Sequence, residues 1–364
     1  MHVRENIKTL LPYVPGKPIE ELERELGLKE IIKLASNENP LGASPKGLEA
    51  AKKALTGIHL YPDGSGYHLT GAIAERHGVA RPQVVLGNGS NEVIEIAART
   101  FLAPGDEAIY SRHAFIVYPL ICKAIGATGI EVPPLPDLGH DLEGIAAAVT
   151  SKTRFIFLAN PNNPTGTMFP QSAWKKFLGR VPADIPILVD EAYAEYVTDP
   201  DYPDPWKDLA AGRNLIITRT FSKIFGLAGL RIGYAVSTPE ISDLMNRVRP
   251  PFNANTVAQA AALAALSDED FVRRSREVNV RGLRYLRAHL EKLGLKVTPS
   301  WGNFILAGLG RPAGSVYEAL LRKGVIARPV GVYDLPNHLR ITVGTQEEIE
   351  TLVKALSAVL GTGA

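Results

Sequence analysis

The sequence predicts an α/β protein whose central sheet is mostly parallel and flanked by helices. Between residues 80 and 237, short runs rich in β-branched residues alternate with stretches that have apolar residues at helical spacing. Several of the short runs are apolar almost throughout, which is typical of strands covered on both faces. The chain has 364 residues, more than one compact core usually fills, so we expect two domains.

Six segments are the expected strands of this sheet. They are QVVLG (83–87), EAIYS (107–111), TRFIFLAN (153–160), IPILVDEAY (185–193), NLIITRTF (214–221) and RIGYAVS (231–237). The stretch SNEVIEIAARTFLAPGD (90–106) predicts a helix that ends at a Pro-Gly stop. The proline-rich stretch 198–212 predicts a surface excursion between two strands.

A second, smaller α+β domain is expected after the RPPFN break at 249–253. An Ala-rich helix follows the break, then a long charged helix over 268–294, strands within 296–309 and 338–344, and a last helix from about 346. We therefore expect three parts: residues 1–30 as an N-terminal segment packing with the small domain, 31–250 as the large domain, and 251–364 as the small C-terminal domain.

Composition argues against several classes of function. The formal net charge is +2, and no block of Lys or Arg supplies the basic stripe of a nucleic-acid binder. Cys122 is the single cysteine, which excludes an intrachain disulfide framework, and we expect it to be buried. The eight histidines lack ligand spacing, so we expect no metal site. The first residues do not resemble a signal peptide and no run of eighteen apolar residues occurs, so we expect a cytoplasmic protein without membrane contact.

Candidate chemistry gathers at predicted strand ends, where open α/β sheets place their ligands. Lys223, in TFSKIFGLAGLRIG (220–233), follows a buried strand, and lost hydration lowers the pKa of its amine, which can then form a Schiff base. Asp190, in DEAY, ends an apolar run and needs a cationic partner, such as a protonated pyridine nitrogen. GNGSNE (87–92) precedes a helix and suits a phosphate, to which Arg231 adds a guanidinium fork.

Each of these pieces alone has an ordinary structural explanation, as a turn, a cap or a surface lysine. Together, they make the sequence resemble the fold-type I pyridoxal-phosphate-dependent aminotransferases, and within them the histidinol-phosphate aminotransferase group. The resemblance covers nearly the whole chain. It rests on YVPGKP (13–18), LASNENPLG (34–42), YPD (61–63), GNGSNE (87–92), NPNNPTG (160–166), DEAY (190–193), TFSKIFGLAGLRIG (220–233) and LRITVGT (339–345).

The resemblance implies a site for pyridoxal 5'-phosphate. Lys223 carries the cofactor, Asp190 pairs with its pyridinium nitrogen, and Asn163 and Tyr193 hydrogen-bond its ring hydroxyl. Phe115 stacks on the ring, although core packing explains this residue equally well and Tyr118 is the alternative. The cofactor phosphate is bound by Gly89, Ser90, Asn91, Thr220, Ser222 and Arg231. Tyr61 reaches the phosphate of a neighbouring subunit, which implies a homodimer with a shared active site.

The resemblance also implies substrates. Arg340 matches the carboxylate-binding arginine of the family, and Arg328 lies twelve residues earlier on a predicted neighbouring strand, where a surface ion pair is an equal alternative. Tyr13 is expected to cover the substrate phosphate, and Asn39 to lie by the reacting amine. Two departures occur: Asn91 stands where the family often has aspartate, and YSRHAF (110–115) replaces a Pro-Thr-aromatic run.

The activity implied is transfer of the amino group of histidinol phosphate to 2-oxoglutarate, giving imidazole acetol phosphate and glutamate in histidine biosynthesis. Three alternatives stay open. They are an aromatic or broad-range aminotransferase, a decarboxylase of the threonine-phosphate type, and a binding module without activity.

Overall fold

A seven-stranded sheet forms the centre of the large domain in the computed structural model, which describes residues 2–12 and 15–361. The strand order is β2-β8-β7-β6-β5-β3-β4, and every strand is parallel to the others except β8. The bounds are β2 Val84–Gly87, β3 Glu107–Ser111, β4 Thr128–Val132, β5 Thr153–Ala159, β6 Ile187–Asp190, β7 Leu215–Thr220 and β8 Gly233–Val236. The mostly parallel sheet expected from the sequence is confirmed.

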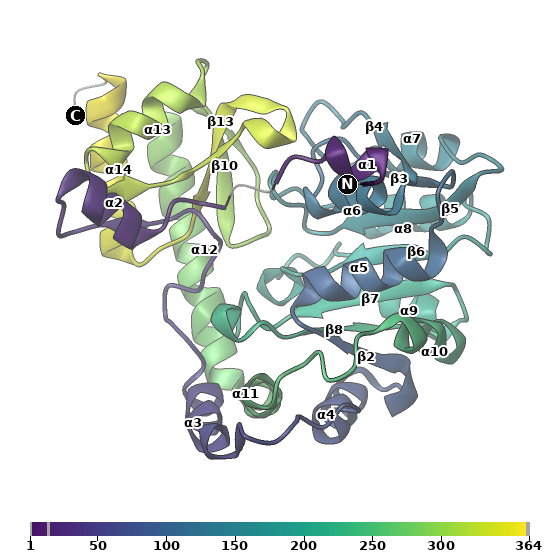
Figure 1. Cartoon of the computed structure of the whole chain (residues 1–364). Helices are drawn as coiled ribbons and strands as arrows, with labels where there is room; N and C mark the ends of the chain where they lie inside the picture. The colour runs from purple at the N-terminus through teal and green to yellow at the C-terminus, as the bar shows by residue number, and fades with distance from the viewer. Residues whose placement is uncertain (1, 13–14, 362–364) are drawn as a thin grey trace.

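Helices cover both faces of this sheet (Figure 1). The apolar run at 155–159 of strand β5 is covered on both faces, because Ile156 packs into one core cluster and its neighbours Phe155 and Phe157 into another. One face packs against α5 Ser90–Phe101, α6 Val117–Ile125 and α10 Pro239–Val248. The other packs against α3 Pro45–Ala54, α4 Tyr67–His77, α7 Leu142–Ala147, α8 Gln171–Leu178, α9 Pro205–Ala210 and α11 Thr256–Leu266.

The small domain is an antiparallel sheet of order β12-β13-β10-β9 with helices packed on it. Its strands are β9 Lys296–Thr298, β10 Phe304–Gly308, β12 Arg328–Val330 and β13 Leu335–Thr342, and its helices are α12 Glu269–Lys292, α13 Ala313–Leu321 and α14 Gln346–Leu360. A short parallel pair, β1 Ile32–Lys33 and β11 Val325–Ile326, joins the start of the large domain to the small one. The long helix α12 runs from the small domain down to α11 (Figure 1).

The six strands expected in the large domain are all present, as are the long charged helix and the last helix. Cys122 is buried, as expected. The segment 198–212 connects β6 and β7 and has many exposed residues, as expected, but it also contains α9 and its aromatic rings pack inward. The ring of Trp206 stacks on His77 with centroids 3.8 Å apart, and the Tyr202 hydroxyl donates to the backbone oxygen of Asn160 at 2.5 Å.

The N-terminal segment contacts both parts of the molecule. Helix α1 (Glu5–Lys8) lies on α6, where Asn6 Nδ2 donates to the backbone oxygen of Lys123 at 2.7 Å. Helix α2 (Ile19–Leu26) packs Leu22 with Leu321 and Ile326 of the small domain. We propose that residues 15–30 go with the small domain, and that the large domain extends from 31 through α11, whose alanines pack in the large-domain core.

Within residues 2–12 and 15–361, short 3-10 helices lie at Leu55–Gly57, Arg81–Gln83, Ala194–Tyr196, Ala228–Leu230 and Gly331–Tyr333. Among the described helices, none combines the length and apolar character needed to cross a membrane.

Candidate active site

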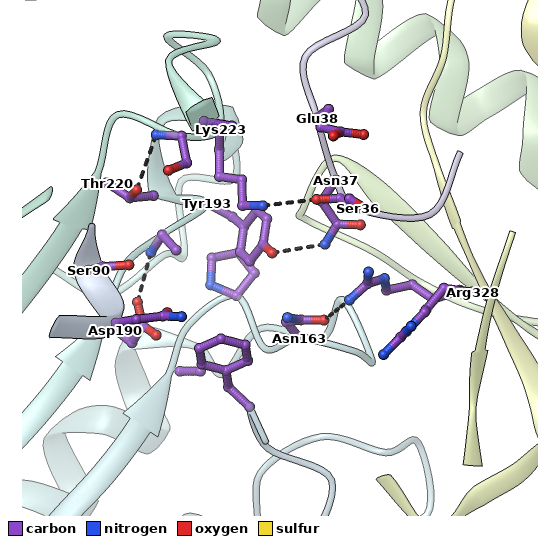
Figure 2. Close-up of a pocket in the computed structure, with 18 of the residues that line it drawn as sticks. Ser36, Asn37, Glu38, Ser90, Asn163, Asp190, Tyr193, Thr220, Lys223 and Arg328 are labelled. Atoms are coloured by element: carbon purple, nitrogen blue, oxygen red, sulfur yellow. Dashed lines mark hydrogen bonds between the residues drawn. The ribbon is translucent and has the colours of Figure 1, made fainter. Parts of the chain in front are cut away.

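A cavity of about 270 Å³ opens where the carboxyl ends of β5, β6 and β7 face the small domain. The strand register brings these ends together, because Ala159 pairs with Asp190 and Asp190 with Thr218 across the parallel strands. Twelve of the sixteen residues expected at the site line this cavity: Ser90, Asn91, Phe115, Asn163, Asp190, Tyr193, Thr220, Ser222, Lys223, Arg231, Arg328 and Arg340. Figure 2 shows many of them converging on one space.

Lys223 enters the cavity from the loop after β7. Its Nζ donates to the backbone oxygen of Ser36 at 3.1 Å. Burial, and then the positive charge of Arg340, lower the pKa of the Lys223 amine from 10.5 to about 7. A large share of this amine is therefore neutral and nucleophilic near neutral pH.

Asp190 lies at the end of β6, on the floor of the cavity. Its Oδ2 accepts a hydrogen bond from the Tyr118 hydroxyl at 2.9 Å, and its Oδ1 accepts from Thr218 Oγ1 and the Ala192 backbone N–H, both at 3.2 Å. Burial raises the pKa of this carboxyl, although the three hydrogen bonds act against the shift. Asp190 forms no ion pair with a residue of the described chain, so a cation entering the cavity would be its natural partner.

Tyr118 stands behind Asp190 rather than over the cavity. Its ring is fully buried and stacks on Phe157 with centroids 4.7 Å apart. Phe115 lines the cavity itself and meets Tyr118 edge-on. Of the two aromatic residues considered for stacking on a bound ring, the geometry therefore favours Phe115, and Tyr118 supports the carboxylate.

An anion cradle lies at the N-terminus of α5. Gly89 has φ +84 and ψ 165, and a Cβ there would lie 2.3 Å from Arg231 Nη2, so only glycine fits beside the guanidinium. Arg231 Nη1 donates to Ser222 Oγ at 3.2 Å, and Thr220 Oγ1 accepts from the Ser222 backbone N–H at 3.1 Å. Gly89 does not line the cavity, but it lets these donors and the helix N-terminus gather at one point, which suits a phosphate.

Two arginines face the cavity from the small domain. Arg328 and Arg340 are paired directly across β12 and β13. Arg340 Nη1 donates to Asn163 Oδ1 at 2.5 Å and Nη2 to the Ala35 backbone oxygen at 2.6 Å, while its buried Nε has no protein partner. Its planar group also lies 5.5 Å from the centroid of the Phe304 ring. Arg328 is thus on the neighbouring strand, as predicted, and both cations can meet an anionic substrate.

The structure places the remaining expected residues elsewhere. Asn39 is buried but does not line the cavity, because its Nδ2 donates to the Ile224 backbone oxygen and to Ser275 Oγ, both at 2.8 Å. It anchors the residue after Lys223 rather than facing the amine. Tyr61 is 83% exposed and stacks on Phe252, away from the cavity of its own chain. Tyr13 lies outside the described residues.

The sequence analysis missed several cavity residues. Ser36, Asn37 and Glu38 of the LASNENPLG motif line the cavity, whereas Asn39 is the residue of this motif that was expected there. Asn37 has φ +56, a left-handed conformation that asparagine tolerates better than most residues. Tyr333, which comes from the loop before β13, also lines the cavity, and its sequence context carries no comparable signal.

Among the described residues, no group of three or more His, Cys, Asp or Glu could hold a metal ion.

The parallel sheet, the buried lysine and the carboxylate without a cation are what a protein of the aminotransferase class needs, and comparison with known proteins shows that class. The family model described as aminotransferase class I and II matches residues 29–356, so the chain belongs to this family. The expected family is thereby confirmed.

More closely, the chain is 53% identical over 359 residues to histidinol-phosphate aminotransferase 2 of Methylococcus capsulatus, covering 97% of each chain. It is 51% identical to a protein of the same name from Pseudomonas fluorescens, covering 98% of this chain and 97% of that one. Among solved structures, it resembles the histidinol-phosphate aminotransferase of Sinorhizobium meliloti in complex with pyridoxal-5'-phosphate, with a TM-score of 0.90 and 29% identity, covering 100% and 98% of the two chains.

Proposed function

We propose that the protein transfers the amino group of histidinol phosphate to 2-oxoglutarate, giving imidazole acetol phosphate and glutamate, with pyridoxal phosphate as its cofactor. The observation that carries the proposal is the joint presence, in one cavity, of the Lys223 amine, the unpaired Asp190 carboxylate, and two arginines opposite them. The names of relatives about 50% identical over nearly the whole chain support the choice of substrate.

The residues present fit the cofactor. Lys223 would bond to its aldehyde carbon, Asp190 would hold its ring nitrogen protonated, and the cradle of Ser90, Ser222 and Arg231 would bind its phosphate. Asn163 and Tyr193 line the same cavity and would hydrogen-bond the ring hydroxyl, and Phe115 would cover one face of the ring. When bound, the cofactor supplies a ring that withdraws electrons from the substrate Cα.

The chain's own part in the reaction is to bind, orient and move protons. Once the substrate amine has replaced it, the Lys223 Nζ would take the proton from the substrate Cα as a base and return it, as an acid, to the cofactor carbon that the lysine had left. The pKa of about 7 in the cofactor-free chain suits both roles near neutral pH. Arg340 and Arg328 bind the substrate anion, which is the phosphate of histidinol phosphate in one half-reaction and the carboxylates of 2-oxoglutarate in the other.

We further propose that the protein works as a homodimer. Tyr61 is exposed, and the neighbouring side chains Leu55, Ile58 and Leu60 are 53%, 64% and 65% exposed. A second copy covering these apolar side chains would bury them and could carry the Tyr61 hydroxyl to its own phosphate cradle. Mixing inactive Tyr61→Ala subunits with inactive Lys223→Ala subunits should then restore activity in the mixed dimers, whereas independent sites would give none.

The first experiment loads the protein with pyridoxal phosphate and follows its visible absorbance during addition of histidinol phosphate and then 2-oxoglutarate. The absorbance should fall with the first and return with the second. Lys223→Ala should abolish both changes. A faster response to phenylalanine or tyrosine would favour an aromatic aminotransferase, and release of carbon dioxide from threonine phosphate without 2-oxoglutarate would favour a decarboxylase.

A further inference from the structure

We infer that Asn37 is a positioning residue, which directs the Tyr193 hydroxyl proton into the cavity and ties it to the strand that carries Arg340. The inference rests on the proposed function, because it concerns the ring-hydroxyl side of the proposed cofactor site.

The first observation is a hydrogen bond of fixed direction. The Asn37 side chain is buried, only 1% exposed, and its Nδ2 donates to the Tyr193 hydroxyl oxygen at 2.9 Å. Because the hydroxyl accepts this bond, its own proton is left for another acceptor. Tyr193 lines the cavity, and its ring is held edge-on against Phe304 with centroids 5.2 Å apart. The proton is therefore available to an oxygen bound in the cavity (Figure 2).

The second observation fixes which way the Asn37 amide points. The Thr342 hydroxyl accepts from the Asn37 backbone N–H at 2.9 Å and donates to Asn37 Oδ1 at 3.2 Å. Among the described residues, Asn37 Oδ1 is the acceptor that the structure gives to the single Thr342 hydroxyl proton, which favours the amide oxygen facing Thr342 and the amide nitrogen facing Tyr193. Asn303 Nδ2 also donates to the Asn37 backbone oxygen at 3.0 Å.

The third observation links this arrangement to substrate binding. Thr342 and Arg340 are two residues apart on β13, so their side chains leave the same face of the strand. Arg340 donates to the backbone oxygen of Ala35, and Lys223 donates to that of Ser36. Three consecutive residues therefore hold three side chains of the site. The backbone oxygens of residues 35 and 36 accept hydrogen bonds from Arg340 and Lys223, and the side chain of residue 37 orients Tyr193.

The Tyr193 hydroxyl stays protonated in this setting. Burial raises the pKa of Tyr193 to about 12, while the charge of Arg340 and the hydrogen bond from Asn37 act against the shift. The Tyr193 hydroxyl can therefore donate a hydrogen bond near neutral pH, and the direction of its O–H bond decides which oxygen accepts it.

The test uses the loaded enzyme without any amino donor and measures the pH midpoint of the bound cofactor's visible absorbance. Asn37→Gly removes the amide while keeping the left-handed backbone, and Tyr193→Phe removes the hydroxyl. Asn37→Gly should shift the midpoint in the same direction as Tyr193→Phe, by up to about one pH unit. Asn37→Asp should shift it at least as far, because a carboxylate accepts the Tyr193 proton and turns it away from the cavity.

A double variant, Asn37→Gly with Tyr193→Phe, distinguishes an effect through Tyr193 from a general loss of stability. In a Tyr193→Phe background, Asn37→Gly should cause no further shift of the midpoint. The control is Asn279→Ala, which removes another buried amide, bonded to the Gly302 oxygen at 2.9 Å, and should lower thermal stability without moving the midpoint.

An unchanged midpoint in Asn37→Gly, or equal shifts from Asn37→Gly with and without Tyr193, would overturn the positioning role. Since no amino donor is present, these outcomes do not depend on histidinol phosphate being the substrate. A wild-type protein that takes up no pyridoxal phosphate would instead overturn the proposed function itself, together with this inference.

Discussion

The reactivity of Lys223 offers a quantitative test of the site that needs no substrate. With a pKa of about 7, roughly half of the Lys223 amine is neutral at pH 7. An exposed lysine, with a pKa near 10.4, is neutral in only about one molecule in 2,500 at that pH. Lys223 should therefore present roughly a thousandfold more neutral amine than a surface lysine, provided a small reagent reaches it through the cavity.

The assay is competitive labelling of the cofactor-free protein with limiting acetic anhydride from pH 5 to 10, read by mass spectrometry. The labelling rate of Lys223 should level off above about pH 8, whereas that of a free lysine derivative added as a reference should rise about tenfold per pH unit to about pH 10. A Lys223 midpoint above about pH 9 would refute the reasoning.

The surrounding charges predict the signs of two variants. Burial is the largest cause of the lowered pKa of Lys223, Arg340 and Arg231 lower it further, and Glu38 and Asp190 raise it. Arg340→Met should therefore raise the labelling midpoint, and Glu38→Gln should lower it. The unfolded chain keeps this proton up to about pH 10.4, whereas the folded chain releases it near 7, so the cofactor-free fold should gain stability from this group as pH rises between these values.

Four further predictions concern binding and stability. Gly89→Ala should weaken pyridoxal phosphate binding about tenfold or more, because the new Cβ meets Arg231 and strains the backbone by about 1–3 kcal/mol. The control is Gly27→Ala, at a glycine that also has a positive φ but has nothing within 4 Å of the new Cβ, and it should leave the affinity unchanged in the same titration. Arg219→Met leaves two buried glutamates uncompensated and should lower the free energy of unfolding by about 3–5 kcal/mol in urea, against about 1 kcal/mol or less for the exposed Arg273→Met. Arg328→Ala should reduce kcat/KM for histidinol phosphate about 10–100-fold and affect glutamate less, and equal losses for both would remove it from substrate discrimination. Removing the proposed cofactor should lower the Tm by about 3 °C relative to protein held at 100 times its Kd, and an unchanged Tm would argue against binding.

The parts of the site that the sequence predicts well are those fixed by strand ends. Lys223 and Asp190 follow apolar runs, so their place at one sheet edge follows from parallel pairing alone. The local sequence also indicates Arg231 and the glycines before α5, because the loop after Lys223 and the turn before α5 are rich in glycine.

The residues that escaped prediction depend on contacts between distant parts of the chain. Asn37 bonds to Thr342, 305 residues away, and no local pattern announces that pairing. The inward packing of Trp206 was hidden in the same way, because prolines around it indicate a loop while its stacking partner, His77, comes from α4. Tyr61 was expected from the family resemblance, and its role at the phosphate of a neighbouring subunit stays a prediction.

The direction of β8 explains why Lys223 and Arg231, which line the same cavity, are so near in the sequence. Strand β8 runs against β7, so the chain turns back at the edge where β7 ends and needs no crossover helix. A parallel β8 would require a dozen or more residues to return to the opposite edge, and Arg231, just before β8, would then begin far from Lys223. Because of this reversal, the length of the loop between Lys223 and Arg231 sets the distance between them, so an insertion there would displace Arg231. The crossover connections elsewhere in the sheet tolerate changes in length better.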